Sequence, residues 1–137
     1  MDHKTWSVYT ILGDGELQEG SVWEAAMAAA HHRLDNLTAI VDRNFLQIDG
    51  PTEKVMSLEP LEDKWKAFGW NVLTCDGHDH IEFILKCEEA KRCMGKPSVI
   101  LARTVMGKGI PTIENNHRWH GKAPSEEESI RFLNELT

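Results

Sequence analysis

Four short apolar runs alternate with segments of helical periodicity, and this alternation sets the expected fold. The runs are rich in β-branched and aromatic residues and are bounded by glycine, proline or polar residues, as in strands covered on both faces. We therefore predict strands at residues 6–12, 37–41, 70–75 and 98–104. Helices are predicted at residues 18–34, 60–68, 80–94 and 125–136. This order favours an α/β fold with a doubly wound, mostly parallel sheet.

Two of the predicted helices are amphipathic. The helix at 80–94 places Ile81, Ile84 and Leu85 on one side, with lysine and glutamate on the other. The last helix begins with Ser125 and has Glu128 three residues later, which is a capping-box pattern.

The first strand has the character of a central strand, although the chain supplies only later strands. A central strand normally has neighbours on both sides, so we expect either a small fold or one whose other half is missing. The apolar segment 45–51 is too short and too interrupted for a helix, and we expect a loop or short strand over the sheet edge.

Composition excludes several classes of protein. The 137 residues suffice for one compact domain, with 41% hydrophobic and 27% charged residues. The net charge is −7 and lysine and arginine form no cluster, which argues against nucleic acid as a partner. The apolar runs are too short to span a membrane, and no signal peptide is evident. The three cysteines lack metal-binding spacing and fit reduced, core-filling thiols in a cytoplasmic protein.

Two of the predicted strands end in polar residues able to bind a metal ion. Gly13-Asp14-Gly15 follows the first strand, and Asp42-Arg43-Asn44 ends the second. In a βαβ unit both strand ends lie at one sheet edge, where ligands of open α/β sheets bind. Asp14 and Asn44 offer hard oxygen ligands of the kind that hold Mg²⁺ on a phosphate-bearing molecule. We therefore expect a cation and diphosphate anchor at this edge.

His120 is the strongest candidate for a catalytic group outside this pair. It lies beside a glycine in a long loop beyond the last predicted strand, where polar catalytic side chains are often found. Imidazole can donate a hydrogen bond to a developing oxyanion or transfer a proton near neutral pH. His117 has surface-like neighbours, and His78 and His80 follow a strand end but are interpreted as ordinary histidines without a functional role. Lys108 is equally well explained as a solvated side chain.

Several motifs together resemble those of transketolases. They are Gly-Asp-Gly-x-Leu-Gln-Glu-Gly from Gly13, Asn-Leu-x-Ala-Ile-x-Asp-x-Asn from Asn36, Ile-Asp-Gly from Ile48, Gly-Lys-Gly from Gly107 and Trp-His-Gly from Trp119. The similarity covers nearly the whole chain and is greatest to the separately encoded N-terminal subunit of split transketolases. The resemblance implies the thiamine-diphosphate-binding fold.

The same resemblance implies roles for the matching positions. The implied Mg²⁺ ligands are the side chains of Asp14 and Asn44 and the carbonyl of Leu46. The implied cofactor-binding positions are Gly13, Asp14, Gly15, Asn44, Ile48 and His120, with Ile48 near the thiazolium ring. The implied catalytic residues are His120, which contacts diphosphate and substrate, and Glu19, an acid at the subunit interface. Arg43 stands where family members vary and receives no role.

The function that the resemblance implies requires a second polypeptide. It is the transfer of two-carbon ketol units between sugar phosphates in the pentose phosphate pathway, with thiamine diphosphate and Mg²⁺ or another divalent cation as cofactors. No part of the chain resembles the pyrimidine-binding domain, so we expect the partner to be a C-terminal transketolase subunit, in a homodimer or heterotetramer.

The beginning of the diphosphate-binding domain is also not recognisable in the sequence. Residues 1–137 are therefore expected to form a single, incomplete domain that is inactive alone. An apolar patch beside the first strand or helix should then be exposed and promote dimerisation or aggregation.

Three alternatives stay open. They are a truncated, catalytically inactive remnant or interaction module, a component of another thiamine-diphosphate enzyme, and an unrelated flavodoxin-like binding module. The donor and acceptor sugars are not indicated by these residues.

Overall fold

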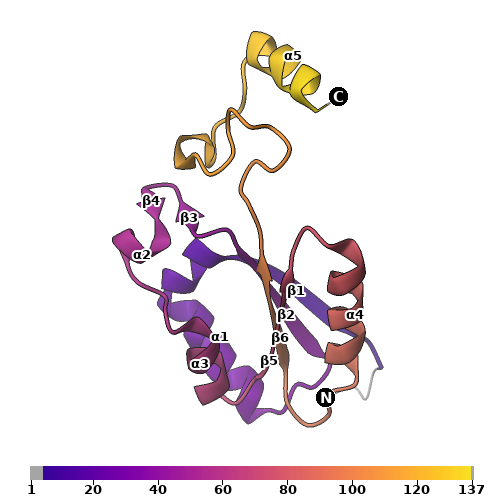
Figure 1. Ribbon diagram of the computed structural model, residues 1–137. Helices are drawn as coiled ribbons and strands as arrows, with labels where there is room; N and C mark the ends of the chain where they lie inside the picture. Colours follow the sequence, from indigo (N-terminus) through magenta and orange to yellow (C-terminus); the bar gives the residue numbers. More distant parts are fainter. Residues whose placement is uncertain (1–4, 137) are drawn as a thin grey trace.

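The computed structural model, which describes residues 5–136, is built around a four-stranded parallel sheet (Figure 1). In spatial order the strands are β1 (Val8–Gly13), β2 (Leu37–Arg43), β6 (Ser98–Arg103) and β5 (Asn71–Asp76). All their pairings are parallel. A separate two-stranded hairpin follows β2 and consists of β3 (Leu46–Gln47) and β4 (Gly50–Pro51). The predicted α/β class and parallel sheet are confirmed.

Helices lie on both faces of the sheet, as the doubly wound arrangement requires. Figure 1 shows α1 and α3 on one side and α4 on the other. The helical segments are η1 (Asp14–Gln18), α1 (Gly20–His31), α2 (Thr52–Val55), α3 (Leu61–Ala67), α4 (His80–Lys91), η2 (His117–Trp119) and α5 (Glu126–Glu135). The predicted helix 18–34 is shorter than expected, since Arg33 has a left-handed φ of 52° and the helix ends before it. The sequence did not predict α2.

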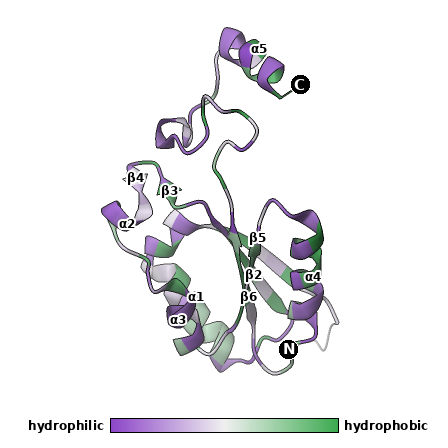
Figure 2. Ribbon diagram, in the orientation of Figure 1, coloured by the Kyte–Doolittle hydropathy of each residue, from purple (hydrophilic) through white to green (hydrophobic). Residues whose placement is uncertain are grey.

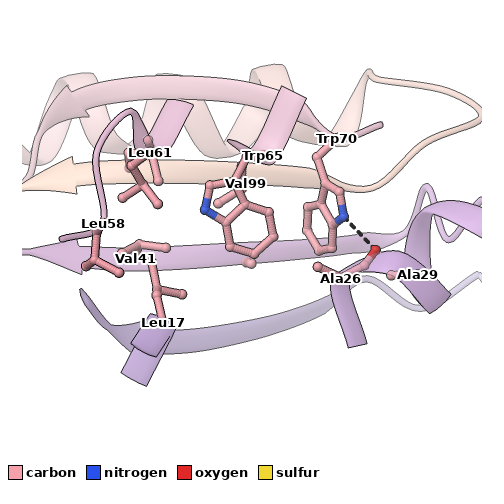
Figure 3. Packing of buried hydrophobic residues seen from close by; sticks show 11 residues of the cluster. Leu17, Ala26, Ala29, Val41, Leu58, Leu61, Trp65, Trp70 and Val99 are labelled. Carbon is pink, nitrogen blue, oxygen red and sulfur yellow. Dashed lines mark hydrogen bonds between the residues drawn. The ribbon is translucent and has the colours of Figure 1, made fainter. Parts of the chain in front are cut away.

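The larger core lies between the sheet and the pair α1 and α3. Trp65 is 1% exposed and its ring lies 5.2 Å from that of Trp23 and 4.8 Å from that of Trp70. Trp70 donates its Nε1 hydrogen to the carbonyl of Ala26, 2.9 Å away, which joins α1 to the residue before β5 (Figure 3). This aromatic cluster fixes α1 and α3 over the strands whose carboxyl ends carry the site.

The smaller core lies under α4. Phe83, Cys87 and Ala90, one helical face of α4, pack against β5 and β6. Ile81, Ile84 and Leu85 share another side of the helix, as predicted, but that side is exposed. Figure 2 shows hydrophobic colour on α4 as well as on the strands. The helix thus has two apolar stripes, and only one faces the sheet.

β1 is an edge strand, so its prediction as a central, buried strand is wrong for this structure. Within residues 5–136 it pairs with β2 alone. Its side chains Val8, Tyr9 and Ile11 are exposed, Ile11 by 73%. An exposed apolar surface beside the first strand is therefore present as expected, and its effect on dimerisation stays a prediction.

The segment after β6 extends away from the sheet (Figure 1). We call residues 105–136 the arm. It packs mainly on itself, with the rings of Trp119 and Phe132 5.1 Å apart. The predicted capping box is present, because Ser125 accepts from the N–H of Glu128 and Glu128 accepts from that of Ser125. In the described part of the chain, no helix has both the length and the apolar character needed to cross a bilayer.

Candidate functional site

The predicted site residues line one cavity at the carboxyl ends of β1 and β2. The cavity has a volume of about 550 Å³. The predicted residues among its walls are Gly13, Asp14, Gly15, Glu19, Asn44, Leu46, Ile48 and His120. They come from the end of β1, the turn before α1, the end of β2, the hairpin and the arm. The fold therefore brings together side chains that are far apart in the sequence.

Asp14 has one free carboxylate oxygen in a buried position. The residue is 1% exposed. Its Oδ2 accepts from the N–H of Phe45 at 2.7 Å and from Nη1 of Arg43 at 3.0 Å. Its Oδ1 is buried and has no hydrogen-bond partner among the described residues. Burial raises the pKa of Asp14, although Phe45 and Arg43 act in the opposite direction. Buried polar atoms normally have partners, so an orphaned carboxylate oxygen fits a cation ligand.

Asn44 lies at the end of β2 and is held in a fixed orientation. Its Nδ2 donates to Oδ2 of Asp42 at 3.3 Å, and its Oδ1 accepts from the N–H of Leu46 at 2.9 Å. A carboxamide oxygen has two lone pairs, so this Oδ1 retains one acceptor position. Asp42 is itself hydrogen-bonded by the Thr104 hydroxyl. These contacts hold the carboxamide oxygen of Asn44 in a fixed position, as a cation ligand would need.

The donor set fits Mg²⁺ better than a transition metal. Asp14, Asn44 and the Leu46 carbonyl supply oxygen only, which is the preference of a hard cation. Across residues 5–136 no three His, Cys, Asp or Glu side chains form a cluster able to hold a metal. The set has a single carboxylate, so it suits an ion whose remaining ligands are phosphate oxygens and water.

The glycines of the turn after β1 serve two different purposes. A Cβ on Gly15 would lie 2.8 Å from Cβ of Gln47, so only glycine lets η1 approach the hairpin this closely. Gly13 donates its N–H to Oε2 of Glu16 at 2.6 Å. A backbone donor at this sheet edge is thus occupied by the chain's own carboxylate.

The remaining predicted residues present accessible side chains to the cavity. Ile48 is 68% exposed at the tip of the hairpin. Glu19 is exposed at the N-cap of α1, and His120 is exposed just after η2. His117 is half-buried, beside Gly50. Ile48, Glu19 and His120 can therefore meet a ligand.

A second cavity, of about 680 Å³, lies at the carboxyl ends of β5 and β6. His78 and Lys108 are among its lining residues. His78 accepts from the N–H of Val105 at 2.8 Å through Nε2, which secures the start of the arm. His80 is the exposed first residue of α4 and lies outside both cavities. For His78 this contact supports a structural role.

Arg43, to which the sequence analysis assigned no role, is buried beside Asp14. It is 3% exposed and makes hydrogen bonds or ion pairs with Asp14, Thr52, Glu53 and Glu59. Partial burial tends to raise the pKa of Glu53, but hydrogen bonds from Ser57 and Arg43 lower it to about 2. The only local signal was an arginine between two polar residues at a strand end, and its partners are not adjacent in the sequence.

Comparison with known proteins gives a consistent family. Residues 1–136 match the family model described as transketolase, thiamine diphosphate binding domain. The chain is 51% identical over 127 residues to a 6-deoxy-6-sulfo-D-fructose transketolase subunit of Clostridium sp.. It is 43% identical over 137 residues to one of the apulose-4-phosphate transketolase subunits of Phocaeicola vulgatus.

These matches cover 93% and 100% of this chain but 46% and 49% of the two relatives, so the chain spans about half the length of the curated relatives it matches. Among solved structures, transketolase from Leishmania mexicana superposes with a TM-score of 0.85 at 31% identity. That match covers 95% of this chain and 19% of the other. A transketolase from Pichia stipitis gives a TM-score of 0.84 at 32% identity, with the same coverage.

Proposed function

Because the chain belongs to the family of transketolase thiamine-diphosphate-binding domains, we propose that it supplies the cation and diphosphate half of a transketolase active site. The observation that carries this proposal is the buried, unpartnered Oδ1 of Asp14 in the cavity that Asn44 and Leu46 also line. An oxygen-only ligand set at a parallel sheet edge is the arrangement that a cation-bound diphosphate requires.

Each residue would act through a particular group. Asp14 Oδ1, Asn44 Oδ1 and the Leu46 carbonyl would hold Mg²⁺. Gly13 and Gly15 would offer backbone groups to the diphosphate, and Ile48 would pack near the thiazolium ring. When bound, thiamine diphosphate supplies the carbanion-stabilising chemistry of two-carbon transfer, which the protein directs by position and charge.

His120 would serve the substrate side of the cavity. Its imidazole is exposed there, on the arm rather than on the sheet. From that place it can donate a hydrogen bond to the diphosphate or to the oxygen of a sugar phosphate near its reacting carbons. Glu19, exposed at the start of α1, would meet a second chain, in a network that links two active sites.

The chain would act with a partner that carries the pyrimidine-binding domain. Two relatives are named as subunits, which supports an enzyme assembled from separate chains. Their names specify different sugars, so the family relation does not select one for this chain. The exposed apolar side chains of β1 and α4 favour a second possibility, an interaction module without catalysis.

Titration with thiamine diphosphate and Mg²⁺, with and without a candidate partner subunit, tests the proposal. We expect calorimetric binding that requires Mg²⁺, and ketol transfer only when the partner is present. Cofactor binding without ketol transfer in the presence of any candidate partner would favour the interaction module. A chain that binds neither the cofactor nor the ion, alone or with the partner, would overturn the proposed function.

Substitution of Glu16 should strengthen cofactor binding. Its carboxylate holds the Gly13 N–H, a donor that we assign to the diphosphate, and it adds a negative charge to the cavity wall. Removing one like charge a few ångströms from an anion in water is worth about 1 kcal/mol, or roughly fivefold in affinity. We expect Glu16→Gln to bind thiamine diphosphate several-fold more tightly in the same calorimetric titration.

Glu24→Gln is the matched control, because Glu24 is an exposed acid on α1 that does not line the cavity. It makes the same change in net charge and should leave the affinity unchanged. Weaker binding by Glu16→Gln than by the wild type would show that Glu16 helps to hold the cofactor instead of competing with it.

A further inference from the structure

An ion-pair network centred on the buried Arg43 holds the oxygen of Asp14 that is not free, Oδ2. Arg43 is the last residue of β2, and its guanidinium contacts Phe45 before the hairpin and Thr52 and Glu53 of α2 after it. Nη1 donates to Asp14 at 3.0 Å and to the Thr52 hydroxyl at 2.9 Å. Nη2 donates to Glu53 and to Glu59, both at 2.8 Å. Four contacts from two nitrogens leave the guanidinium little freedom to turn.

The ring of Phe45 further restricts the guanidinium. It lies 4.0 Å from the Arg43 carbon Cζ, within the range of a cation–π contact. The same residue donates its backbone N–H to Oδ2 of Asp14. Phe45 has a left-handed φ of 65°, a conformation that few non-glycine residues adopt.

The charges of the network add up in favour of a cation. Arg43 contributes +1 and Asp14, Glu53 and Glu59 contribute −1 each, so the sum is −2. The positive charge of Arg43 is therefore more than offset by Glu53 and Glu59. Arg43 can hold Asp14 without making the adjacent space repulsive for a divalent ion.

The geometry divides the two oxygens of Asp14 between two tasks. Oδ2 has both of its hydrogen bonds from Arg43 and Phe45, whereas Oδ1 has none. A carboxylate fixed at one oxygen cannot rotate or bind the ion through both oxygens, so the other is presented as a single ligand. Partners behind a ligand orient it in this way in many metal sites.

We propose that Arg43 is a positioning residue that locks the Asp14 carboxylate by Oδ2 and so reserves Oδ1 for the cation. The inference rests on the proposed function, because it assumes that Asp14 is a cation ligand. It adds a residue to the site that touches neither the ion nor the diphosphate.

The test compares Mn²⁺ binding by the wild type and by Arg43→Lys and Arg43→Met, in the presence of thiamine diphosphate and with and without the partner subunit. Electron paramagnetic resonance gives both the affinity and the spectrum of the bound ion, and the spectrum reports ligand geometry. Removing a residue that hydrogen-bonds to a metal ligand typically lowers the affinity for the metal about 10- to 100-fold. We expect that loss for Arg43→Met. The lysine ammonium is a single point charge and cannot reproduce the planar, two-nitrogen geometry of the guanidinium. Arg43→Lys should therefore bind Mn²⁺ more weakly than the wild type, with an altered spectrum.

Arg103→Met is the matched control. Arg103 ends β6, is the register partner of Arg43, and is exposed beside the second cavity. Its replacement should change neither the affinity nor the spectrum. Urea unfolding of every variant shows whether the fold is kept, since a loss of stability lowers the bound fraction but leaves the spectrum of the bound ion as it is.

The outcomes separate the two proposals. If the wild type binds no Mn²⁺ with the cofactor, either alone or with the partner subunit, the proposed function fails and the role of Arg43 falls with it. If the wild type binds and a folded Arg43→Met matches it in affinity and spectrum, only the role of Arg43 is overturned. If Arg43→Met does not fold, Arg43→Lys decides: wild-type affinity and spectrum overturn the role, and a weaker, altered site supports it.

Discussion

Asp14→Ala should abolish binding of the cofactor while the chain remains folded. The substitution removes the only carboxylate of the proposed ligand set, whose Oδ1 has no partner in the described chain. Mutation of a residue that hydrogen-bonds to a metal ligand lowers metal affinity about 10- to 100-fold. Loss of the charged ligand itself should therefore weaken binding by more than about 100-fold. Calorimetric titration with Mg²⁺ and thiamine diphosphate measures the effect.

Asp63→Asn and Asp14→Asn complete that experiment. Asp63 is an exposed acid on α3 that pairs with Lys66, so its neutralisation should leave cofactor affinity unchanged. Asp14→Asn keeps the shape of the side chain and one of its oxygens but removes the charge, and we expect it to resemble Asp14→Ala. Affinity within about threefold of the wild type for Asp14→Ala, which is less than 1 kcal/mol, would be incompatible with Asp14 as a ligand.

Trp65→Ala should be the most damaging single change to the stability of the fold. Trp65 is 1% exposed and lies in the larger core beside Trp70 (Figure 3). Its ring also lies 5.2 Å from that of Trp23. Replacing a buried tryptophan by alanine typically costs about 3–5 kcal/mol, because the cavity closes only in part. Urea unfolding should show a midpoint shifted far to lower urea with a similar slope.

Trp65→Phe tests why that tryptophan is costly to lose. The Nε1 of Trp65 is buried and has no hydrogen-bond partner among residues 5–136. Phenylalanine keeps an aromatic ring against both neighbours and removes an unsatisfied donor, whose burial costs about 1–3 kcal/mol. We therefore expect Trp65→Phe to lose less than about 2 kcal/mol. Equal losses for the two variants would mean that the indole nitrogen has a partner in solution.

The position of the site followed from sequence because it depends on topology more than on packing. In a parallel sheet the carboxyl ends of neighbouring strands meet at one edge, whatever side chains fill the core. Asp14 and Asn44 each directly follow one of the first two strands, so their proximity required only that β1 and β2 pair in parallel, as they do.

Packing details were less accessible from the sequence. α4 carries two apolar stripes, one with Phe83 and one with Ile84, and periodicity alone cannot say which faces the sheet. β1 reads as a buried strand because its residues are apolar, but apolar character does not reveal whether a neighbour is present. In both cases the tertiary arrangement, rather than the local pattern, decides exposure.

Arg43 illustrates a different limit. Its partners Glu53 and Glu59 lie on α2 and on the loop that follows it, and a short helix at 52–55 leaves almost no periodic signal. An arginine at the end of a strand is ordinarily read as solvated. Its burial depends on α2 and Glu59 coming to lie beside the end of β2, which the sequence pattern does not specify.

We expect the open edge of β1 to make the lifetime of the free chain depend on its concentration. Among the described residues, one side of this strand has no β-partner, and its backbone groups can pair with any extended segment that meets them. The rate of self-association depends at least on the square of the concentration of this chain. The rate of capture by another protein is proportional to the concentration of each of the two proteins. In the proposed assembly with a partner subunit, the relative rates of synthesis of the two chains would decide how much of this protein is captured, before cofactor supply has any influence.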